Sequence, residues 1–125
     1  THSKFGIIGI VNDIPQLGWR AFLMAWRQVL DSAALSEGQS AEVLHDGNVI
    51  AIFRHQGELY AIDGLCMHQG GPLARGKLAN GTVQCPWHGW MYELATGNNA
   101  VTCQRMLRTY PVQEIDGKIA IDVSR

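Results

Sequence analysis

Two short segments decide the fold of this chain: Cys66-Met67-His68 and Cys85-Pro86-Trp87-His88, with the sixteen residues 69–84 between them. Each segment offers one thiolate and one imidazole, and two cysteines with two histidines predict a metal site. A zinc finger pairs cysteine with cysteine and histidine with histidine. Here each segment mixes the two, which favours a binuclear iron–sulfur cluster with both sulfurs on one iron and both nitrogens on the other. The alternative is a zinc site or a buried disulfide on an unrelated β fold.

The residues that follow these ligands resemble the two cluster-binding loops of Rieske proteins. The first loop continues as Gln69-Gly70-Gly71-Pro72-Leu73 and the second as Gly89-Trp90-Met91-Tyr92. Together with the ligands they are similar to the family patterns C-x-H-x-G-x-x-L and C-P-x-H-G. The family's later landmarks are matched by Thr96-Gly97, Tyr110-Pro111-Val112 and Asp116-Gly117. The resemblance covers the chain from about Ala25 to the C-terminus.

The resemblance implies one Rieske-type [2Fe–2S] cluster and assigns its four ligands. Cys66 and Cys85 are expected to bind the inner iron as thiolates, and His68 and His88 the outer iron through Nδ1. Because two neutral imidazoles replace two thiolates, the cluster is less negative, and its reduction potential lies above that of an all-thiolate cluster.

Residues close to the ligands are expected to tune the cluster. Glycines let backbone N–H groups approach the sulfides, prolines stiffen the loops, and a leucine covers the cluster and limits water. The residues expected in these supporting roles are Gly70, Gly71, Leu73, Pro86, Gly89, Trp90 and Tyr92.

Two departures separate the chain from the high-potential branch of the family. That branch has one further cysteine in each loop, joined in a disulfide, and the corresponding positions here are Gly71 and Trp87. That branch also has a serine that donates to a bridging sulfide, where Trp90 stands here. The phenol of Tyr92 is retained and is expected to donate to a cysteine sulfur. The hypothesis is a low potential that Tyr92 raises somewhat.

Turn residues predict an all-β fold built from hairpins. Asp-Gly and Asn-Gly pairs supply the positive φ that tight hairpin turns need, and fourteen glycines argue against long helices. The first strand is expected near Trp26, followed by one helical turn at residues 31–35, and Ile119, Ile121 and Val123 are expected on one face of the last strand. The prediction is a Rieske-like antiparallel β sandwich with a smaller cluster-binding subdomain, about 64–105, inserted between strands of the larger part.

The length of 125 residues corresponds to one domain. Residues 24–125 are predicted to form the Rieske domain, and residues 1–23 match nothing in the family pattern. Two interpretations of residues 1–23 stay open. Met24 is the natural start and they are an added or read-through sequence, or they are a real extension that packs on the domain or on a second subunit.

Composition excludes some partners. With 10 basic and 11 acidic residues the net charge is −1, so no basic field is present to bind nucleic acid or an anionic membrane. The early apolar run, Phe5 to Val11, is too short for a membrane-spanning helix.

The three cysteines include one that no ligand role claims, Cys103, which is expected to be a small buried side chain. His2, His45 and His55 are expected at surface or turn positions. An unpaired thiol beside iron–sulfur chemistry favours a reducing cytoplasm.

The sequence is consistent with three functions. The leading hypothesis is a one-electron carrier of the Rieske ferredoxin type, which takes electrons from a flavin-containing reductase and passes them to a terminal oxygenase. The chain has no residues left to build a catalytic mononuclear iron site, so it is not expected to be an enzyme by itself. The alternatives are a small electron-transfer subunit of a larger reductase similar to nitrite reductase, and a structural zinc module. The redox partners, the final substrate and the oligomeric state stay open.

Overall fold

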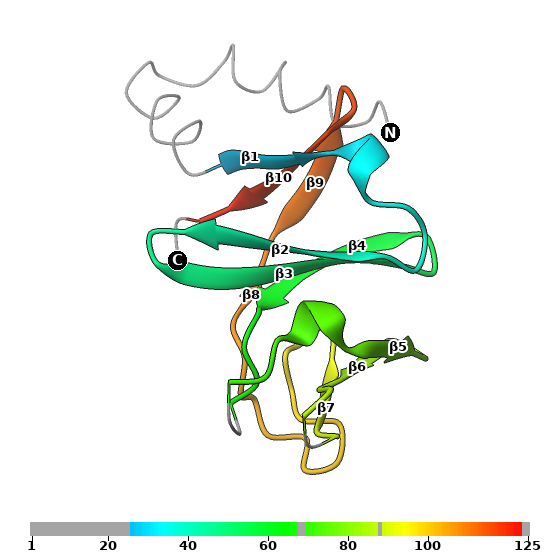
Figure 1. The fold of residues 1–125 in the computed structure, drawn as a ribbon, viewed down its shortest axis with the longest axis vertical. Coiled ribbons are helices and arrows are strands. Elements are labelled where there is room, and N and C mark those ends of the chain that lie inside the picture. The colour runs from blue at the N-terminus through cyan, green and yellow to red at the C-terminus, as the bar shows by residue number, and fades with distance from the viewer. Residues whose placement is uncertain (1–25, 68–69, 88, 124–125) are drawn as a thin grey trace. The chain divides into compact units, whose positions relative to one another are not determined.

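The structure, a computed structural model, describes residues 26–67, 70–87 and 89–123, and these form short antiparallel strands with two 3-10 turns (Figure 1). They divide into two compact units. One unit contains residues 26–34 and 111–123, and the other contains residues 35–110. No helix in this described part of the chain is long and apolar enough to cross a membrane.

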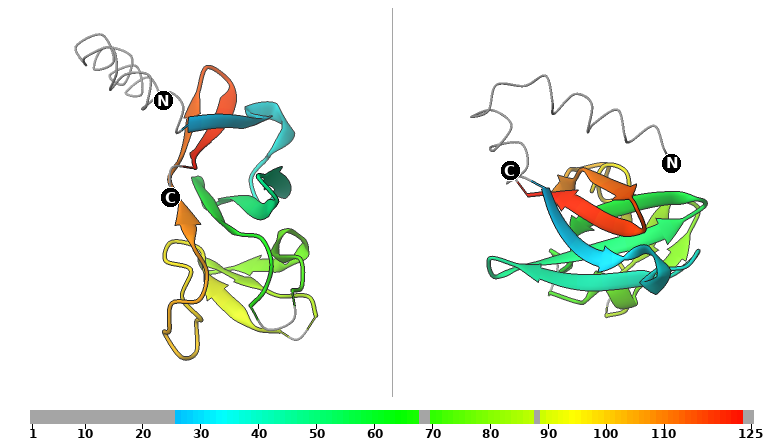
Figure 2. Two further views of the ribbon diagram at one scale, coloured as in Figure 1. Left: turned by 90° about the vertical axis from the view of Figure 1, so that its left-hand side faces the viewer. Right: turned by 90° about the horizontal axis from the view of Figure 1, so that it is seen from above.

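The first unit is a three-stranded sheet in the order β1-β10-β9, formed by β1 (Trp26–Asp31), β9 (Val112–Ile115) and β10 (Lys118–Asp122). The β9–β10 hairpin turns at Asp116-Gly117, where both residues have positive φ. Its strand β10 pairs with β1, and the right-hand view of Figure 2 shows the two strands beside one another. Ile119 and Ile121 are fully buried and Val123 is partly buried. The predicted first strand is confirmed, and so is the single helical turn, η2 (Ser32–Ala34).

The second unit begins with a four-stranded antiparallel sheet in the order β2-β3-β4-β8. Its turns at Asp46-Gly47 and Gln56-Gly57 are two pairs of residues, and all four residues have positive φ between 49° and 79°, the conformation of tight two-residue hairpins. The central strand β3 buries the run from Ile50 to Phe53 completely. The strands are β2 (Ser40–His45), β3 (Asn48–His55), β4 (Glu58–Asp63) and β8 (Thr109–Tyr110).

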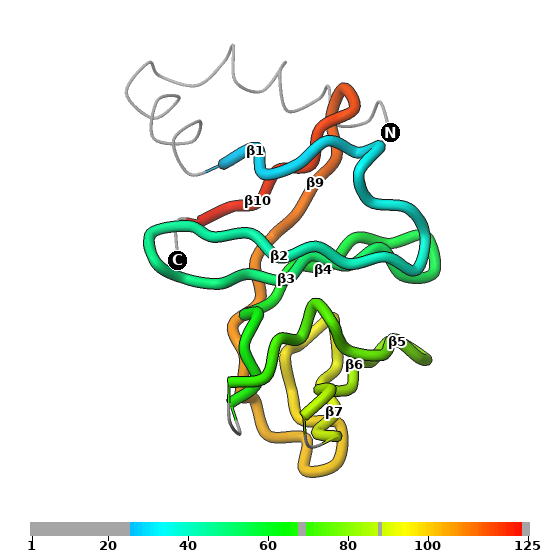
Figure 3. Tube along the Cα trace, viewed as in Figure 1, coloured from blue at the N-terminus to red at the C-terminus, as the bar shows by residue number. Residues whose placement is uncertain are grey.

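The smaller sheet of the second unit lies in the chain between β4 and β8, as Figure 3 lets the reader trace. It has the order β5-β6-β7 and is preceded by η3 (Leu73–Arg75). Its strands are β5 (Lys77–Ala79), β6 (Thr82–Gln84) and β7 (Met91–Glu93). Because β4 and β8 pair directly, the smaller sheet is an insertion into the larger one. The predicted all-β antiparallel class and the inserted subdomain are confirmed.

Side-chain hydrogen bonds between described residues join the larger sheet to the insertion. The hydroxyl of Ser40 donates to the carbonyl of Ala74, and the N–H of Gly81 donates to Nε2 of His55 over 2.9 Å. The prediction of a surface or turn position for His55 was wrong: this side chain is 9 % exposed. Burial is tolerated because the neutral imidazole accepts a backbone hydrogen bond that would otherwise be missing. His45 is partly exposed beside the carboxylate of Asp46, and His2 lies outside the described residues.

The chain enters the insertion after Asp63 and leaves it at Arg108, and the Asp63 carboxylate holds these two points together. We call this place the neck of the insertion. Asp63 Oδ2 accepts the N–H of Arg108 and Oδ1 accepts the hydroxyl of Tyr110, both over 2.8 Å. The N–H of Asp63 in turn donates to the carbonyl of Arg108 over 2.9 Å. Burial raises the pKa of Tyr110 to about 12, and the hydrogen bond to Asp63 adds to this effect. The phenol of Tyr110 therefore keeps its proton and donates a hydrogen bond to Asp63.

Candidate metal centre

The first predicted ligand loop follows β4 and closes on itself through two backbone hydrogen bonds. The N–H of Cys66 donates to the carbonyl of Gly71, and the N–H of Gly70 donates back to the carbonyl of Cys66, both over 2.8 Å. Gly70 has φ +74°, a left-handed conformation that glycine adopts at no steric cost. The predicted ligand His68 belongs to this loop and lies outside the described residues.

The second predicted ligand loop follows β6 and closes in the same way. The N–H of Cys85 donates to the carbonyl of Trp90 over 2.7 Å, and the N–H of Gly89 donates to the carbonyl of Cys85 over 3.0 Å. Gly89 has φ +78°. In both loops the cysteine pairs with the residue five positions later, and a left-handed glycine stands four positions later. The predicted ligand His88 lies outside the described residues.

Both cysteine side chains lie in an apolar core that the insertion shares with β3 and β4. Cys66 is 3 % exposed and Cys85 is 2 % exposed. Leu73 is fully buried in the same apolar cluster, as expected for a residue that limits water near the sulfurs. The other buried members of the cluster are Ala51, Phe53, Ile62, Val83, Tyr92, Leu94 and Leu107.

A phenol reaches one of the two sulfurs from β7. The hydroxyl of Tyr92 lies 3.0 Å from Sγ of Cys66, and the tyrosine is fully buried. Burial raises the pKa of Tyr92, and the contact with Cys66 raises it further. The phenol therefore keeps its proton and donates it to the sulfur once Cys66 is a thiolate. The expected hydrogen bond from Tyr92 to a cysteine sulfur has the geometry that it requires.

The described donor atoms fit an iron–sulfur cluster. Cys66 and Cys85 are buried and form no disulfide with any described cysteine. A buried thiolate is stable only with compensating charge or hydrogen bonds, which a metal and the Tyr92 phenol supply. A Cβ placed on Gly71 would lie 2.5 Å from Sγ of Cys85, so the first loop leaves room for that sulfur only because residue 71 is glycine. Within the described residues no three metal-binding side chains gather, since two of the four predicted ligands fall outside them.

The other residues singled out in the sequence have different surroundings. Trp90 is partly buried and packs against the core, whereas Pro86 and Trp87 are exposed, Trp87 to 56 %. The prediction that Cys103 is a buried small side chain was wrong, because it is exposed. It has φ +63° in a surface turn, where its N–H donates to the carbonyl of Asn99 over 2.8 Å. No ligand role falls to it.

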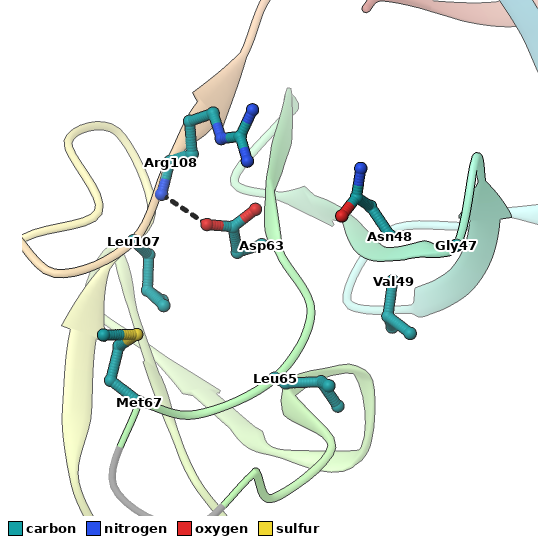
Figure 4. Close-up of a pocket in the computed structure, with 8 residues that line it drawn as sticks. All are labelled: Gly47, Asn48, Val49, Asp63, Leu65, Met67, Leu107 and Arg108. Atoms are coloured by element: carbon teal, nitrogen blue, oxygen red, sulfur yellow. Dashed lines mark hydrogen bonds between the residues drawn. The ribbon is translucent and has the colours of Figure 1, made fainter.

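Sequence reasoning missed the role of Asp63 and of the pocket beside it. A cavity of about 260 Å³ opens next to the first ligand loop. Met67 and Leu107 stand on one side of it, and Asn48 and Val49 on the other (Figure 4). Its full lining is Gly47, Asn48, Val49, Asp63, Leu65, Met67, Leu107 and Arg108. The only signal in the sequence was the Tyr110-Pro111 landmark, which marks where the chain returns from the insertion.

The sequence matches the model of the Rieske [2Fe-2S] domain over residues 25–111. The chain belongs to the Rieske [2Fe–2S] domain family. The p-cumate 2,3-dioxygenase system ferredoxin component of Pseudomonas putida is 35% identical over 92 residues, which are 71% of this chain and 78% of the relative. The naphthalene 1,2-dioxygenase system ferredoxin component of Pseudomonas putida is 28% identical over 100 residues, which are 79% of this chain and 96% of the relative.

A solved structure shares the fold. A chain in the complex of reduced oxygenase and oxidized ferredoxin in carbazole 1,9a-dioxygenase has a TM-score of 0.72 and 25% sequence identity, covering 79% of this chain and 94% of that chain. The cofactor of this Rieske domain is one Rieske-type [2Fe–2S] cluster. When bound, it accepts and releases one electron at a time.

Proposed function

We propose that this protein is a one-electron carrier of the Rieske ferredoxin type, in which Cys66, His68, Cys85 and His88 hold the cluster. The observation that carries the proposal is the pair of buried cysteines in two identically closed loops, with a phenol 3.0 Å from the first sulfur. The similarity runs over nearly the whole length of the naphthalene ferredoxin component. A match over nearly the whole length of a ferredoxin component favours the same carrier role for this chain. The Rieske domain then comprises residues 24–125.

The electron donor in this proposal is a flavin-containing reductase and the acceptor is a terminal oxygenase, both in the cytoplasm. The partner's contact surface is the end of the insertion that carries the ligand loops. Three of the large apolar side chains exposed on the described residues are there, close in sequence to the cysteines: Leu65 at 44 %, Met67 at 62 % and Trp87 at 56 %. Aromatic and methionine side chains are enriched in protein interfaces. These side chains give the partner an apolar contact beside the electron's exit.

This chain's residues prepare the site in three ways. The left-handed glycines Gly70 and Gly89 close the loops that present the ligands. The hydroxyl of Tyr92, 3.0 Å from Sγ of Cys66, donates to this sulfur when it is a thiolate and so stabilises its negative charge. Leu73 fills the core beside both cysteines and excludes water. A site that is built before the electron arrives needs little rearrangement when it leaves.

The test is an EPR spectrum of the dithionite-reduced protein, with iron and acid-labile sulfide measured on the same sample. We expect about two irons and two sulfides per chain and a rhombic signal whose average g lies below that of all-thiolate clusters. Cys66→Ser and Cys85→Ser should lose the cluster, and so should His68→Ala and His88→Ala. Cys103→Ser is the matched control and should keep it, because Cys103 is exposed and outside both loops. A colourless zinc protein that stays EPR-silent after reconstitution with iron and sulfide would overturn the proposal.

A further inference from the structure

The two ligand loops come close together at Gly71, and the hydrogen bonds that close each loop do not require this approach. A Cβ built on Gly71 of the first loop would lie 3.2 Å from Cγ and 3.3 Å from Cδ2 of Trp87 in the second loop. The same Cβ would lie 2.5 Å from Sγ of Cys85. Gly71 is buried, and its φ is not in the left-handed region. Residue 71 is therefore glycine for space, because the indole and the sulfur occupy the room that a side chain would take.

Trp87 divides its surface between this contact and the solvent. Its side chain is 56 % exposed, while the neighbouring Cys85 is only 2 % exposed. The indole atoms near Gly71 are Cγ and Cδ2, and more than half of the side chain is accessible to solvent. An aromatic side chain buries a large area and so contributes substantially even when it is half covered. The contact joins two loops that are otherwise closed separately.

We propose that Trp87 seated on Gly71 is a non-covalent clasp between the two ligand loops. The clasp occupies the two positions at which the high-potential branch of the family is expected to have a disulfide. In this role Trp87 is a positioning residue: it holds the second loop against the first and shields the Cys85 sulfur from water. The inference rests on the proposed function, since the clasp matters for a cluster held by both loops.

Two measurable consequences follow from this arrangement. Loops that separate more easily release iron more easily, so loss of the indole should shorten the lifetime of the cluster. Water near the cluster stabilises its reduced form, which carries one more negative charge than the oxidised form, and solvent exposure is one determinant of the potential. Loss of the indole should therefore shift the reduction potential upward.

The test compares Trp87→Ala and Trp87→Phe with the parent protein. We expect Trp87→Ala to release iron to an added chelator at least about fivefold faster, which corresponds to about 1 kcal/mol, and to show a higher reduction potential by voltammetry. Trp87→Phe should restore most of both properties because a ring still covers Gly71. Leu44→Ala is the control, since Leu44 is an exposed apolar side chain on β2 outside the ligand loops, and it should match the parent protein.

A third measurement follows the loops without the cluster. In iron-free protein, hydrogen exchange of the Cys66 and Cys85 amides reports the bonds to Gly71 and Trp90 that close the loops. Trp87→Ala should speed both exchanges and leave the Leu107 amide, bonded to Gly97, unchanged. The clasp is refuted if Trp87→Ala matches the parent in chelator release and in exchange, or if Trp87→Phe behaves like Trp87→Ala. A parent protein that binds no iron would refute the proposed function instead, and the exchange data would still decide whether the clasp exists.

Discussion

The hydrogen bond from Tyr92 to Cys66 makes a quantitative prediction about the reduction potential. Tyr92→Phe removes one hydroxyl, which lies 3.0 Å from the Cys66 sulfur in a fully buried position. The ring and its packing stay in place. Since the phenol donates to a sulfur that becomes more negative on reduction, the bond stabilises the reduced state more than the oxidised state. The variant should therefore have a lower potential.

The size of the shift follows from the strength of such bonds. A hydrogen bond to a charged group contributes about 1.5–3 kcal/mol, and only the part that differs between the two redox states changes the potential. If about a third of it differs, the change is about 0.5–1 kcal/mol. A tenfold change in an equilibrium constant is about 1.4 kcal/mol or 59 mV for one electron. The expected decrease is therefore about 20–45 mV.

The assay is voltammetry on the parent protein and two matched variants. Tyr110→Phe is the control because Tyr110 is also a buried tyrosine, but its hydroxyl donates to the Asp63 carboxylate and not to a sulfur. It should lower the free energy of unfolding by about 1–2 kcal/mol and leave the potential unchanged. An unshifted potential in Tyr92→Phe would refute the reasoning, and so would an equal shift in both variants, which would point to a general effect of losing a buried hydroxyl.

Three further predictions concern stability. Gly97→Ala should lower the free energy of unfolding in urea by about 2–4 kcal/mol, because Gly97 has φ +76° and a Cβ there would overlap the Leu107 carbonyl. Gly57→Ala is the control: Gly57 has φ +79° but open space around it, so the loss should be only about 1–2 kcal/mol. The pKa of Tyr110 is raised to about 12, so the contribution of its protonated hydroxyl to the free energy of unfolding is complete below the ordinary tyrosine pKa of about 10 and is lost as pH rises toward 12. The difference in unfolding free energy between the parent and Tyr110→Phe should therefore shrink over that range. A constant difference would contradict this prediction. The backbone N–H groups of Gly57 and Gln56 lower the pKa of Glu37, so its carboxylate contributes to stability above the ordinary glutamate pKa of about 4.3 and stops doing so as pH falls below it. Glu37→Gln should remove this part of the loss of stability in acid. Thermal unfolding at pH 3 to 6 would measure the difference.

Local signals predicted the turns and strands correctly. Asp46-Gly47 and Asp116-Gly117 fix hairpins by their own conformational preferences, and the structure has positive φ at all four residues. The alternation of Ile119 and Ile121 identified the buried face of β10 for the same reason. Such features depend on residues close together in the chain and can be read from it.

Features that depend on distant partners were not predicted. His55 is buried because its acceptor meets Gly81, 26 residues away, and Asp63 closes the neck with Arg108 and Tyr110, 45 and 47 residues away. Cys103 was expected inside because cysteine is usually buried, yet a left-handed surface turn places it outside. For His55 and Asp63 the sequence gives the residue type but not the distant partner that decides the environment. For Cys103 the deciding feature is local, the turn that its own N–H closes on the carbonyl of Asn99.

For the candidate ligand site, the motif singled out Cys66, Cys85 and Tyr92, and the structure shows how these side chains are held. Their role at a cluster stays a prediction. The equivalence of the two loop closures was not visible in the sequence, since the histidine stands two positions after Cys66 but three after Cys85. The backbone bonds place the cysteine and the glycine of each loop in the same relation. The contact between Gly71 and Trp87 was also not visible in the sequence, because it depends on how closely the two loops approach in space.

The neck at Asp63 fixes the two ends of the insertion side by side. The insertion starts after Asp63 and returns at Arg108, and these two residues exchange hydrogen bonds over 2.8 and 2.9 Å. To the larger sheet, the whole iron-binding segment is one long loop between two paired strands. Loops whose ends are fixed side by side can change in length and content at small entropic cost. The length of the segment is therefore free to vary, but its buried side chains share one apolar cluster with Ala51, Phe53 and Ile62 and can change only together with the sheet that supports them.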